Sequence, residues 1–179
     1  MSSSVVIMDA EAITRALRRI AHQILEHNPQ PDKFALVGVP SRGVEIAQRL
    51  ADLIAQIEGR RPKMGTVDIS MHRDDLSLRK ALQSIQLTQL PLHLEDLTVI
   101  LTDDVLFTGR TCRAAMDAIS SFGRPTRIQL AVLLDRGHRE LPIRPDYVGK
   151  NLPTARSELV RVHLQNIDAE LDSVCLEKQ

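Results

Sequence analysis

Apolar residues along the chain follow two patterns, a helical spacing of three or four residues and short unbroken runs. The helical spacing is clearest between Asp9 and Asn28, where it is kept by Ile13, Leu17, Ile20 and Ile24. It predicts an amphipathic helix over residues 9–28, with Asp9 as the N-cap and Pro29 directly after the end. The same spacing predicts helices over residues 42–59 and 111–123, each closed by a glycine.

The short apolar runs predict strands. They cover residues 34–40, 66–70, 97–101, 127–135 and 158–164, and the run at 158–164 is expected to be the last strand. Strands that alternate with helices are typical of a parallel sheet covered on both faces, so the sequence predicts an α/β fold. Residues 136–154 are rich in loop formers. We expect one domain over residues 1–179, in which the irregular stretch 71–96 forms a flap-like insertion over one end of the sheet.

Composition sets limits without indicating a function. The 23 Lys and Arg residues balance the 23 Asp and Glu residues, so only a local cluster of charge could indicate a polyanionic partner. Two cysteines without a CxxC pair predict no disulfide framework and suit a reducing, cytoplasmic compartment. No apolar run approaches the ~20 residues of a membrane span, and residues 1–8 lack the basic start of a signal peptide.

Two adjacent carboxylates stand out in the stretch VILTDDVLFTGRTCRAAMDAI. Asp103 and Asp104 follow a predicted strand, and ligands of open α/β sheets bind at the carboxyl ends of strands. The next helix is expected to begin near Thr111, whose own hydroxyl could cap it, so the carboxylates are not needed as caps. Their acceptor oxygens suit vicinal hydroxyls or a hydrated Mg²⁺ ion.

The turn TGRT, residues 108–111, adds a second kind of site. Its backbone N–H groups, its two threonine hydroxyls and the start of a helix together favour an anion, ideally a phosphate. A ribose 5-phosphate fits the acids and the turn at once. The competing nucleotide motifs GxxxxGK[ST] and GxGxxG are absent from the sequence.

The stretch VILTDDVLFTGRT resembles the phosphoribosyl pyrophosphate (PRPP) motif of type I phosphoribosyltransferases. The resemblance implies that family's fold, a central, mainly parallel sheet with helices on both faces and a small flap or hood. In the family the two acids hold the ribose 2′- and 3′-hydroxyls, and the loop holds the 5-phosphate. SRG, residues 41–43, resembles the loop that binds the leaving pyrophosphate through backbone N–H groups and an arginine. The resemblance assigns catalysis to Asp103, Asp104 and Arg42. It assigns PRPP binding to Ser41, Arg42, Gly43, Asp103, Asp104, Val105, Leu106, Phe107, Thr108, Gly109, Arg110 and Thr111.

Nearly the whole chain resembles the PyrR family, and DRGHRELPIRPDYVGKNLPT is the most diagnostic stretch. The resemblance implies that the chain makes UMP and pyrophosphate from uracil and PRPP, with Mg²⁺ held mainly by PRPP rather than by side chains. It also implies that Arg136 and the backbone around Val160 line the base pocket. Arg73 would contact pyrophosphate from the flap or form a salt bridge with a neighbouring aspartate.

Some positions depart from the family pattern, and a second acceptor stays open. Phe107 stands where members carry Tyr, and Ser41 and Arg18 stand where they often carry Thr. The alternative is a hypoxanthine-guanine enzyme without RNA regulation, because PDYVGKNLP also resembles the corresponding loop of those enzymes. They commonly stack the purine on an aromatic ring, and Tyr147 is the only ring nearby. A small pyrimidine needs no such ring, so uracil is favoured.

One face of the first predicted helix is basic. Arg15, Arg18, Arg19 and His22 fall within about 100° of one another, opposite the apolar face. A second basic group comes from the segment that contains His138, Arg139, Arg144 and Lys150. In the PyrR family the two regions line a basic surface of a dimer that binds messenger RNA. The resemblance therefore implies a homodimer or higher oligomer that binds pyrimidine-operon leader RNA in a UMP-dependent manner and regulates transcription by attenuation.

Overall fold

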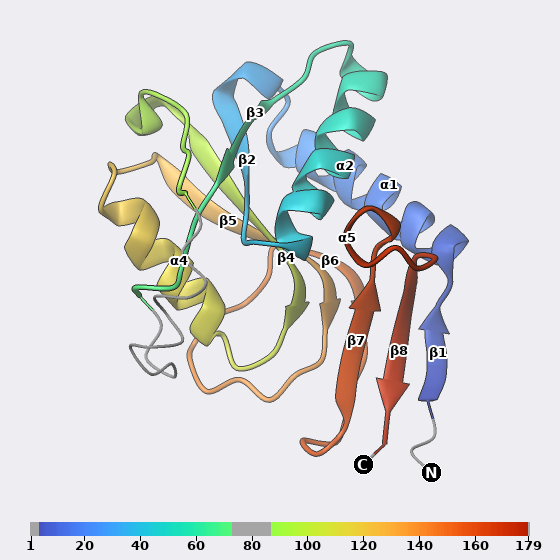
Figure 1. Cartoon of the computed structure of the whole chain (residues 1–179). Coiled ribbons are helices and arrows are strands. Elements are labelled where there is room, and N and C mark those ends of the chain that lie inside the picture. Colours follow the sequence, from blue (N-terminus) through green and yellow to red (C-terminus); the bar gives the residue numbers. More distant parts are fainter. Residues whose placement is uncertain (1–3, 73–86, 179) are drawn as a thin grey trace.

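The computed structural model describes residues 4–72 and 87–178, and a parallel sheet forms the centre of this part of the chain (Figure 1). Five described strands lie in the order β3-β2-β4-β5-β6, and each neighbouring pair is parallel. They are β2 (Phe34–Gly38), β3 (Lys63–Thr66), β4 (Thr98–Leu106), β5 (Arg127–Asp135) and β6 (Tyr147–Asn151). The carboxyl ends of β2, β4, β5 and β6 therefore lie along one edge of the sheet, where a ligand site is expected.

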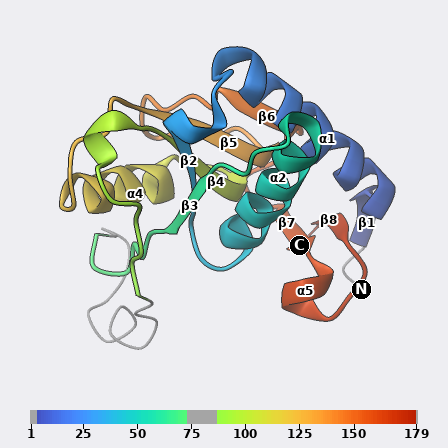
Figure 2. The same ribbon diagram turned by 90° about the horizontal axis from the view of Figure 1, so that it is seen from above.

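Helices cover both faces of this sheet, as the alternation of patterns predicted (Figure 2). One face packs against α1 (Ala10–His27) and α2 (Arg42–Glu58), and the other packs against α4 (Arg110–Ser120). Short 3-10 helices at Pro31–Lys33 and Leu94–Asp96 precede β2 and β4. In the described ranges, no helix has both the length and the apolar character that crossing a membrane requires.

The ends of the first two helices confirm the capping signals in the sequence. The Asp9 carboxylate accepts a hydrogen bond from the backbone N–H of Ala12 at 2.8 Å, which satisfies one of the free donors at the start of α1. Gly59 ends α2 with φ = 70°, a left-handed conformation that glycine adopts without a Cβ clash. Both helices begin and end within a residue or two of the predicted limits.

A second, antiparallel sheet joins the two ends of the chain. Its strands lie in the order β1-β8-β7, with β1 at Ser4–Met8, β7 at Leu159–His163 and β8 at Ser173–Glu177. The prediction that residues 158–164 form the last strand was wrong, because α5 (Gln165–Asp168) and β8 follow it. Both β1 and β8 are stabilised by pairing with segments far away in the sequence, which a local pattern does not reveal.

Two further strands differ from the prediction. The strand expected at residues 66–70 lies instead at Lys63–Thr66, where it pairs with Ala35–Gly38. The chain leaves the sheet after Thr66, and the Asp68 carboxylate accepts hydrogen bonds from the backbone N–H and hydroxyl of Ser70. The stretch expected to be loop contains β6, an edge strand paired with β5. Most of the expected flap, residues 73–86, lies outside the described residues.

Candidate active site

Asp103 and Asp104 lie within β4 rather than after it. The strand continues past its predicted end at Leu101 to Leu106. Its pairing with β2 stops at Thr102, whereas its pairing with β5 runs on to Leu106. The two acids are half-buried where β4 has lost one of its neighbours, so they lie toward the carboxyl end of a central strand as expected, although the strand limit was wrong.

The SRG turn packs directly against the acidic pair. A Cβ atom added to Gly43 would lie 2.5 Å from the Thr102 carbonyl oxygen and 3.3 Å from the Asp103 Cα. The buried Thr102 hydroxyl also donates a hydrogen bond to the Gly43 carbonyl at 2.9 Å. Ser41 is exposed, and Arg42 starts α2 with its guanidinium 2.6 Å from the Asp168 carboxylate. Two motifs about sixty residues apart are therefore in contact.

The loop after β4 leads straight into the N-terminus of α4. Gly109 is the N-cap, with φ = 93°, and the helix begins at Arg110. The expectation that the Thr111 hydroxyl caps the helix was therefore wrong. In the described structure no side chain caps this helix, and the Thr108 hydroxyl accepts only a long hydrogen bond, 3.3 Å, from the Arg110 N–H. The donors of the first turn and the helix dipole together favour an anion here.

A cavity of about 370 Å³ joins the acidic strand to this loop. Of the two acids, Asp103 lines it, together with residues 105–112. Val39, Leu101, Leu130, Val132 and Glu140 complete the lining. The volume suits a small ligand, and the lining combines the polar groups of the loop, Asp103 and Glu140 with aliphatic side chains. The cavity therefore brings together every predicted phosphate-loop residue from Val105 to Thr111.

The segment after β5 supports the phosphate-type loop, a contact that the sequence alone does not predict. The backbone N–H of Glu140 donates to the Thr108 carbonyl at 2.9 Å, and the Arg139 guanidinium donates to the Phe107 carbonyl at 2.8 Å. Arg110 donates to the Glu140 carboxylate at 2.9 Å, and this contact is the main reason that the pKa of Glu140 lies below its usual value. The only sequence signal was a run of charges, which does not reveal a partner.

Arg136 is buried, and its guanidinium holds the segment that leads into β7. It donates to the Thr154 hydroxyl and to the carbonyls of Ala155 and Glu158, at 3.1, 3.0 and 2.9 Å. It also lies 4.2 Å from the centre of the Phe107 ring, and burial lowers its pKa. Val160 lies in β7, two residues after Glu158, the last residue that the Arg136 guanidinium contacts.

A second hollow, of about 340 Å³, lies beside this clamp at the carboxyl ends of β5 and β6. It is lined by residues 135–138 and 151–154. Of the two predicted base-binding residues, Arg136 lines this hollow, whereas Val160 in β7 is not part of its lining. Arg73, the predicted flap contact, lies outside the described residues.

The predicted RNA-binding residues fall into two groups. Arg15, Arg18, Arg19 and His22 are exposed on α1, and Arg19 donates a hydrogen bond to the Gly149 carbonyl, beside the exposed Lys150. Arg144 is exposed as well. His138 and Arg139 are half-buried and bind other parts of the chain. His138 contacts the Thr154 carbonyl at 2.6 Å, and Arg139 pairs with Asp135 at 2.5 Å.

Comparison with known proteins agrees with this geometry. The phosphoribosyl transferase domain family matches residues 6–166. The chain is 54% identical to the bifunctional protein PyrR of Clostridium acetobutylicum, over 97% of each chain. It is 51% identical to the bifunctional protein PyrR of Bacillus mycoides, over 95% of this chain and 96% of that one.

Solved structures share the architecture at lower identity. The hypoxanthine phosphoribosyltransferase of Trypanosoma cruzi superposes with a TM-score of 0.72 at 19% identity, covering 95% of this chain and 89% of that one. The enzyme of the same name from Staphylococcus aureus superposes with a TM-score of 0.69 at 18% identity, covering 95% and 90%. At these identities the similarity establishes the fold alone.

Proposed function

The chain belongs to the phosphoribosyl transferase family and, within it, to the PyrR proteins, and we propose that it transfers the phosphoribosyl group of PRPP to uracil. The products are UMP and pyrophosphate. One observation carries this proposal, the contact between the SRG turn and the acidic strand beside the cavity of the TGRT loop. The same three parts are what a ribose with a 5-phosphate and a 1-pyrophosphate needs.

Each part suits one group of PRPP. Asp103 and Asp104 are acceptors for the ribose hydroxyls, and the TGRT loop with the start of α4 offers donors to the 5-phosphate. Arg42 and the backbone of residues 41–43 face the pyrophosphate. The remaining proposed contacts, Val105, Leu106 and Phe107, place the loop backbone along the same cavity.

The reaction breaks the bond between C1 of the ribose and the pyrophosphate oxygen, and the electron pair leaves with pyrophosphate. Positive charge develops on the sugar, and the carboxylates of Asp103 and Asp104 stabilise it because their orientation is fixed before the reaction. Both carboxylates accept backbone N–H groups, from Asp104 at 2.9 Å and Val105 at 2.8 Å, which holds them in place. Uracil N1 then bonds to C1, and the N1 proton passes to solvent.

Mg²⁺ fits this site as an ion brought by the substrate. Acceptor-only oxygens of Asp103 and Asp104 are hard ligands of the kind that Mg²⁺ prefers. In the described residues, no three His, Cys, Asp or Glu side chains gather in a way that could hold a metal alone. When bound with PRPP, the ion would neutralise charge on the departing pyrophosphate.

The base pocket favours a pyrimidine over a purine. Tyr147, the ring that a purine could stack on, is 2% exposed, and its hydroxyl is hydrogen-bonded to Gln129 and Asn28. It is therefore part of the core. The hollow beside Arg136 instead offers backbone groups together with polar side chains such as His138, Asn151 and Thr154, which can hydrogen-bond uracil.

The transfer is tested by its products. Protein incubated with PRPP, uracil and Mg²⁺ should release pyrophosphate and form UMP in equal amounts. Release of pyrophosphate without UMP would show hydrolysis of PRPP, and the absence of both products would remove the proposal.

A second function, UMP-dependent binding of pyrimidine-operon leader RNA, is favoured by the position of α1. The helix packs along β6 with Arg15, Arg18 and His22 exposed, and its Arg19 donates a hydrogen bond to the Gly149 carbonyl, next to the exposed Lys150. This gives a neutral chain a local basic surface, which two copies would extend. The name bifunctional protein, which the relatives carry, agrees with a second role.

Binding assays with Arg18→Ala test this role. The variant should bind the leader RNA more weakly and with a salt dependence reduced by about one charge, because one phosphate contact is lost. Arg124→Ala, an exposed arginine that follows α4 on the opposite face of the sheet, is the matched control and should bind as the wild type does. UMP should tighten RNA binding, and RNA should tighten UMP binding by the same factor. Equal binding of leader RNA and unrelated RNA would contradict the role.

A further inference from the structure

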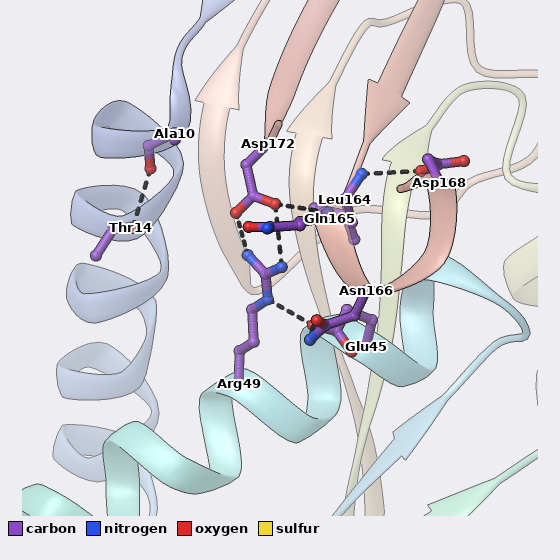
Figure 3. Close-up of polar contacts among 9 residues, drawn as sticks. All are labelled: Ala10, Thr14, Glu45, Arg49, Leu164, Gln165, Asn166, Asp168 and Asp172. Atoms are coloured by element: carbon purple, nitrogen blue, oxygen red, sulfur yellow. Dashed lines mark hydrogen bonds and ion pairs between the residues drawn. The ribbon is translucent and has the colours of Figure 1, made fainter. Parts of the chain in front are cut away.

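The segment between β7 and β8, residues 164–172, is fastened to one face of α2. Figure 3 shows Asp172 facing Arg49, and Asn166 facing Glu45. The Arg49 guanidinium donates to both carboxylate oxygens of Asp172, and its Nε donates to Glu45 at 2.7 Å. Asn166 donates to the same Glu45 oxygen at 2.8 Å. These contacts hold the antiparallel sheet's connecting segment against the helix that begins at the SRG turn.

A second fastening reaches the SRG turn itself. The Arg42 Nη2 atom lies 2.6 Å from the Asp168 Oδ1 atom. Among the residues that the structure describes, Asp168 supplies the only acceptor for the Arg42 guanidinium, through Nη2. The Arg42 Nε is buried and has no hydrogen-bond partner there. The direction in which this guanidinium points is therefore set by one carboxylate.

Asp168 is itself fixed independently of Arg42. Its second oxygen, Oδ2, accepts the backbone N–H of Leu164 at 2.8 Å, as Figure 3 shows. That hydrogen bond is the main reason that the pKa of Asp168 lies below its usual value, with Arg42 adding to the effect. The carboxylate is thus ionised and held by the backbone of a segment that is fastened to α2 at a second point.

We propose that Asp168 is a positioning residue that orients Arg42 toward the pyrophosphate of PRPP, an inference that rests on the proposed function. A free arginine side chain loses rotamer entropy when it is fixed, and this loss costs free energy. Asp168 fixes part of the side chain before the ligand arrives, so less of that cost falls on binding. The Arg42 guanidinium keeps further N–H groups for the pyrophosphate oxygens, because an arginine has five N–H donors.

Calorimetric titration of inorganic pyrophosphate in the presence of Mg²⁺ tests the proposal. Asp168→Asn keeps the shape of the side chain but leaves one oxygen for two donors, and it should weaken pyrophosphate binding about tenfold. Asp172→Asn is the matched control, because it loosens the same segment without touching Arg42, and it should bind pyrophosphate almost as the wild type does. Melting curves followed by circular dichroism show whether both variants fold, and Asp168→Ser replaces the asparagine variant if it does not.

A double-mutant cycle separates orientation of Arg42 from a general structural effect. In an Arg42→Ala background, Asp168→Asn should have no further effect on pyrophosphate affinity, because the residue through which it acts is gone. The inference would be overturned if Asp168→Asn left the pyrophosphate affinity unchanged, or if Asp168→Asn and Asp172→Asn lowered it equally. Tighter binding by Asp168→Asn would also overturn it, because it would mean that Asp168 competes with pyrophosphate for Arg42.

Failure of the proposed function gives a different result. A wild-type protein that binds no Mg²⁺-pyrophosphate would remove the assignment of the SRG turn, and the inference with it. The inference alone would be removed if the wild type binds, Arg42→Ala binds much more weakly, and Asp168→Asn binds as the wild type does.

Discussion

At the scale of single residues, Thr102 links the two halves of the site. It is fully buried in β4, directly before the acidic pair, and its hydroxyl donates to the Gly43 carbonyl at 2.9 Å. A buried hydroxyl needs such a partner, and the partner here belongs to the opposite loop. One side chain therefore fixes the distance between the acids and the SRG turn.

Asp104→Asn should slow UMP formation by roughly 10²–10³-fold, because an amide lacks the charge that stabilises a cationic sugar and the loss of one fixed electrostatic contact is of this size. The amide still fits the half-buried position, so the melting temperature should change little. Initial rates at saturating PRPP and uracil measure the effect. Asp96→Asn, an exposed aspartate of the 3-10 helix before β4, is the control. A folded Asp104→Asn variant with near-normal turnover would exclude the proposed role.

Side chains with local partners were easier to predict than side chains with distant ones. The acids, the glycine turn and the basic face of α1 could be located because their signals lie within a few residues. Arg139 was expected on the RNA-binding surface, yet its guanidinium holds Phe107, Ile143 and Asp135. A sequence gives the charge of an arginine but not the acceptors that the fold places around it.

At the scale of elements, the contact between the β2–α2 turn and β4 defines the site. The turn is so close to the strand that glycine is required at its end, since a Cβ on Gly43 would lie 2.5 Å from the Thr102 carbonyl oxygen. That oxygen belongs to the backbone and cannot rotate away. Any side chain at position 43 must push the SRG turn and the acidic strand apart.

Gly43→Ala should therefore raise the KM for PRPP at least tenfold, through displacement of the SRG turn rather than loss of a contacting group. Gly59→Ala serves as the control for stability. Position 59 has φ = 70° but no atom within 4 Å of an added Cβ, so this variant is strained yet distant from the site. Steady-state kinetics of both variants at several PRPP concentrations provide the comparison. A normal KM for PRPP in Gly43→Ala would contradict the assignment of this turn.

Element boundaries were predictable where caps or long apolar runs mark them. The strand at 127–135 was predicted with its observed limits, and the capped helices were close. The strand at 63–66 was missed because Lys63 and Gly65 disfavour it locally, while its pairing with the fully buried β2 stabilises it. β6 was missed for a similar reason, since Gly149 and Lys150 resemble loop residues until β5 is beside them.

At the scale of the whole molecule, the antiparallel sheet shares its core with the parallel one. Met8, Val162, Leu164 and Val174 belong to the same buried cluster as residues of α1, α2 and the central strands. This common core is what brings Asp168 to Arg42. We propose that the chain unfolds as a single domain for the same reason.

Val174→Ala should lower the free energy of unfolding by about 1–3 kcal/mol, because it leaves a cavity in the shared core. Urea unfolding should give the same midpoint by circular dichroism and by the reactivity of Cys112 in a Cys175→Ser background. Burial raises the pKa of the Cys112 thiol to about 12, so a thiol reagent reports its exposure on α4, the far side of the sheet. Val6→Ala, at a side chain 63% exposed, is the control. Two separate midpoints would contradict the single domain.

The most direct test of the account is a comparison of kcat/KM for uracil, hypoxanthine, guanine, adenine and orotate with saturating PRPP and Mg²⁺. The buried Tyr147 and the small hollow beside Arg136 predict that uracil gives the highest value and UMP the main product. A higher kcat/KM for hypoxanthine or guanine would contradict the uracil assignment, and no transfer to any of the five bases would contradict the phosphoribosyltransferase activity itself.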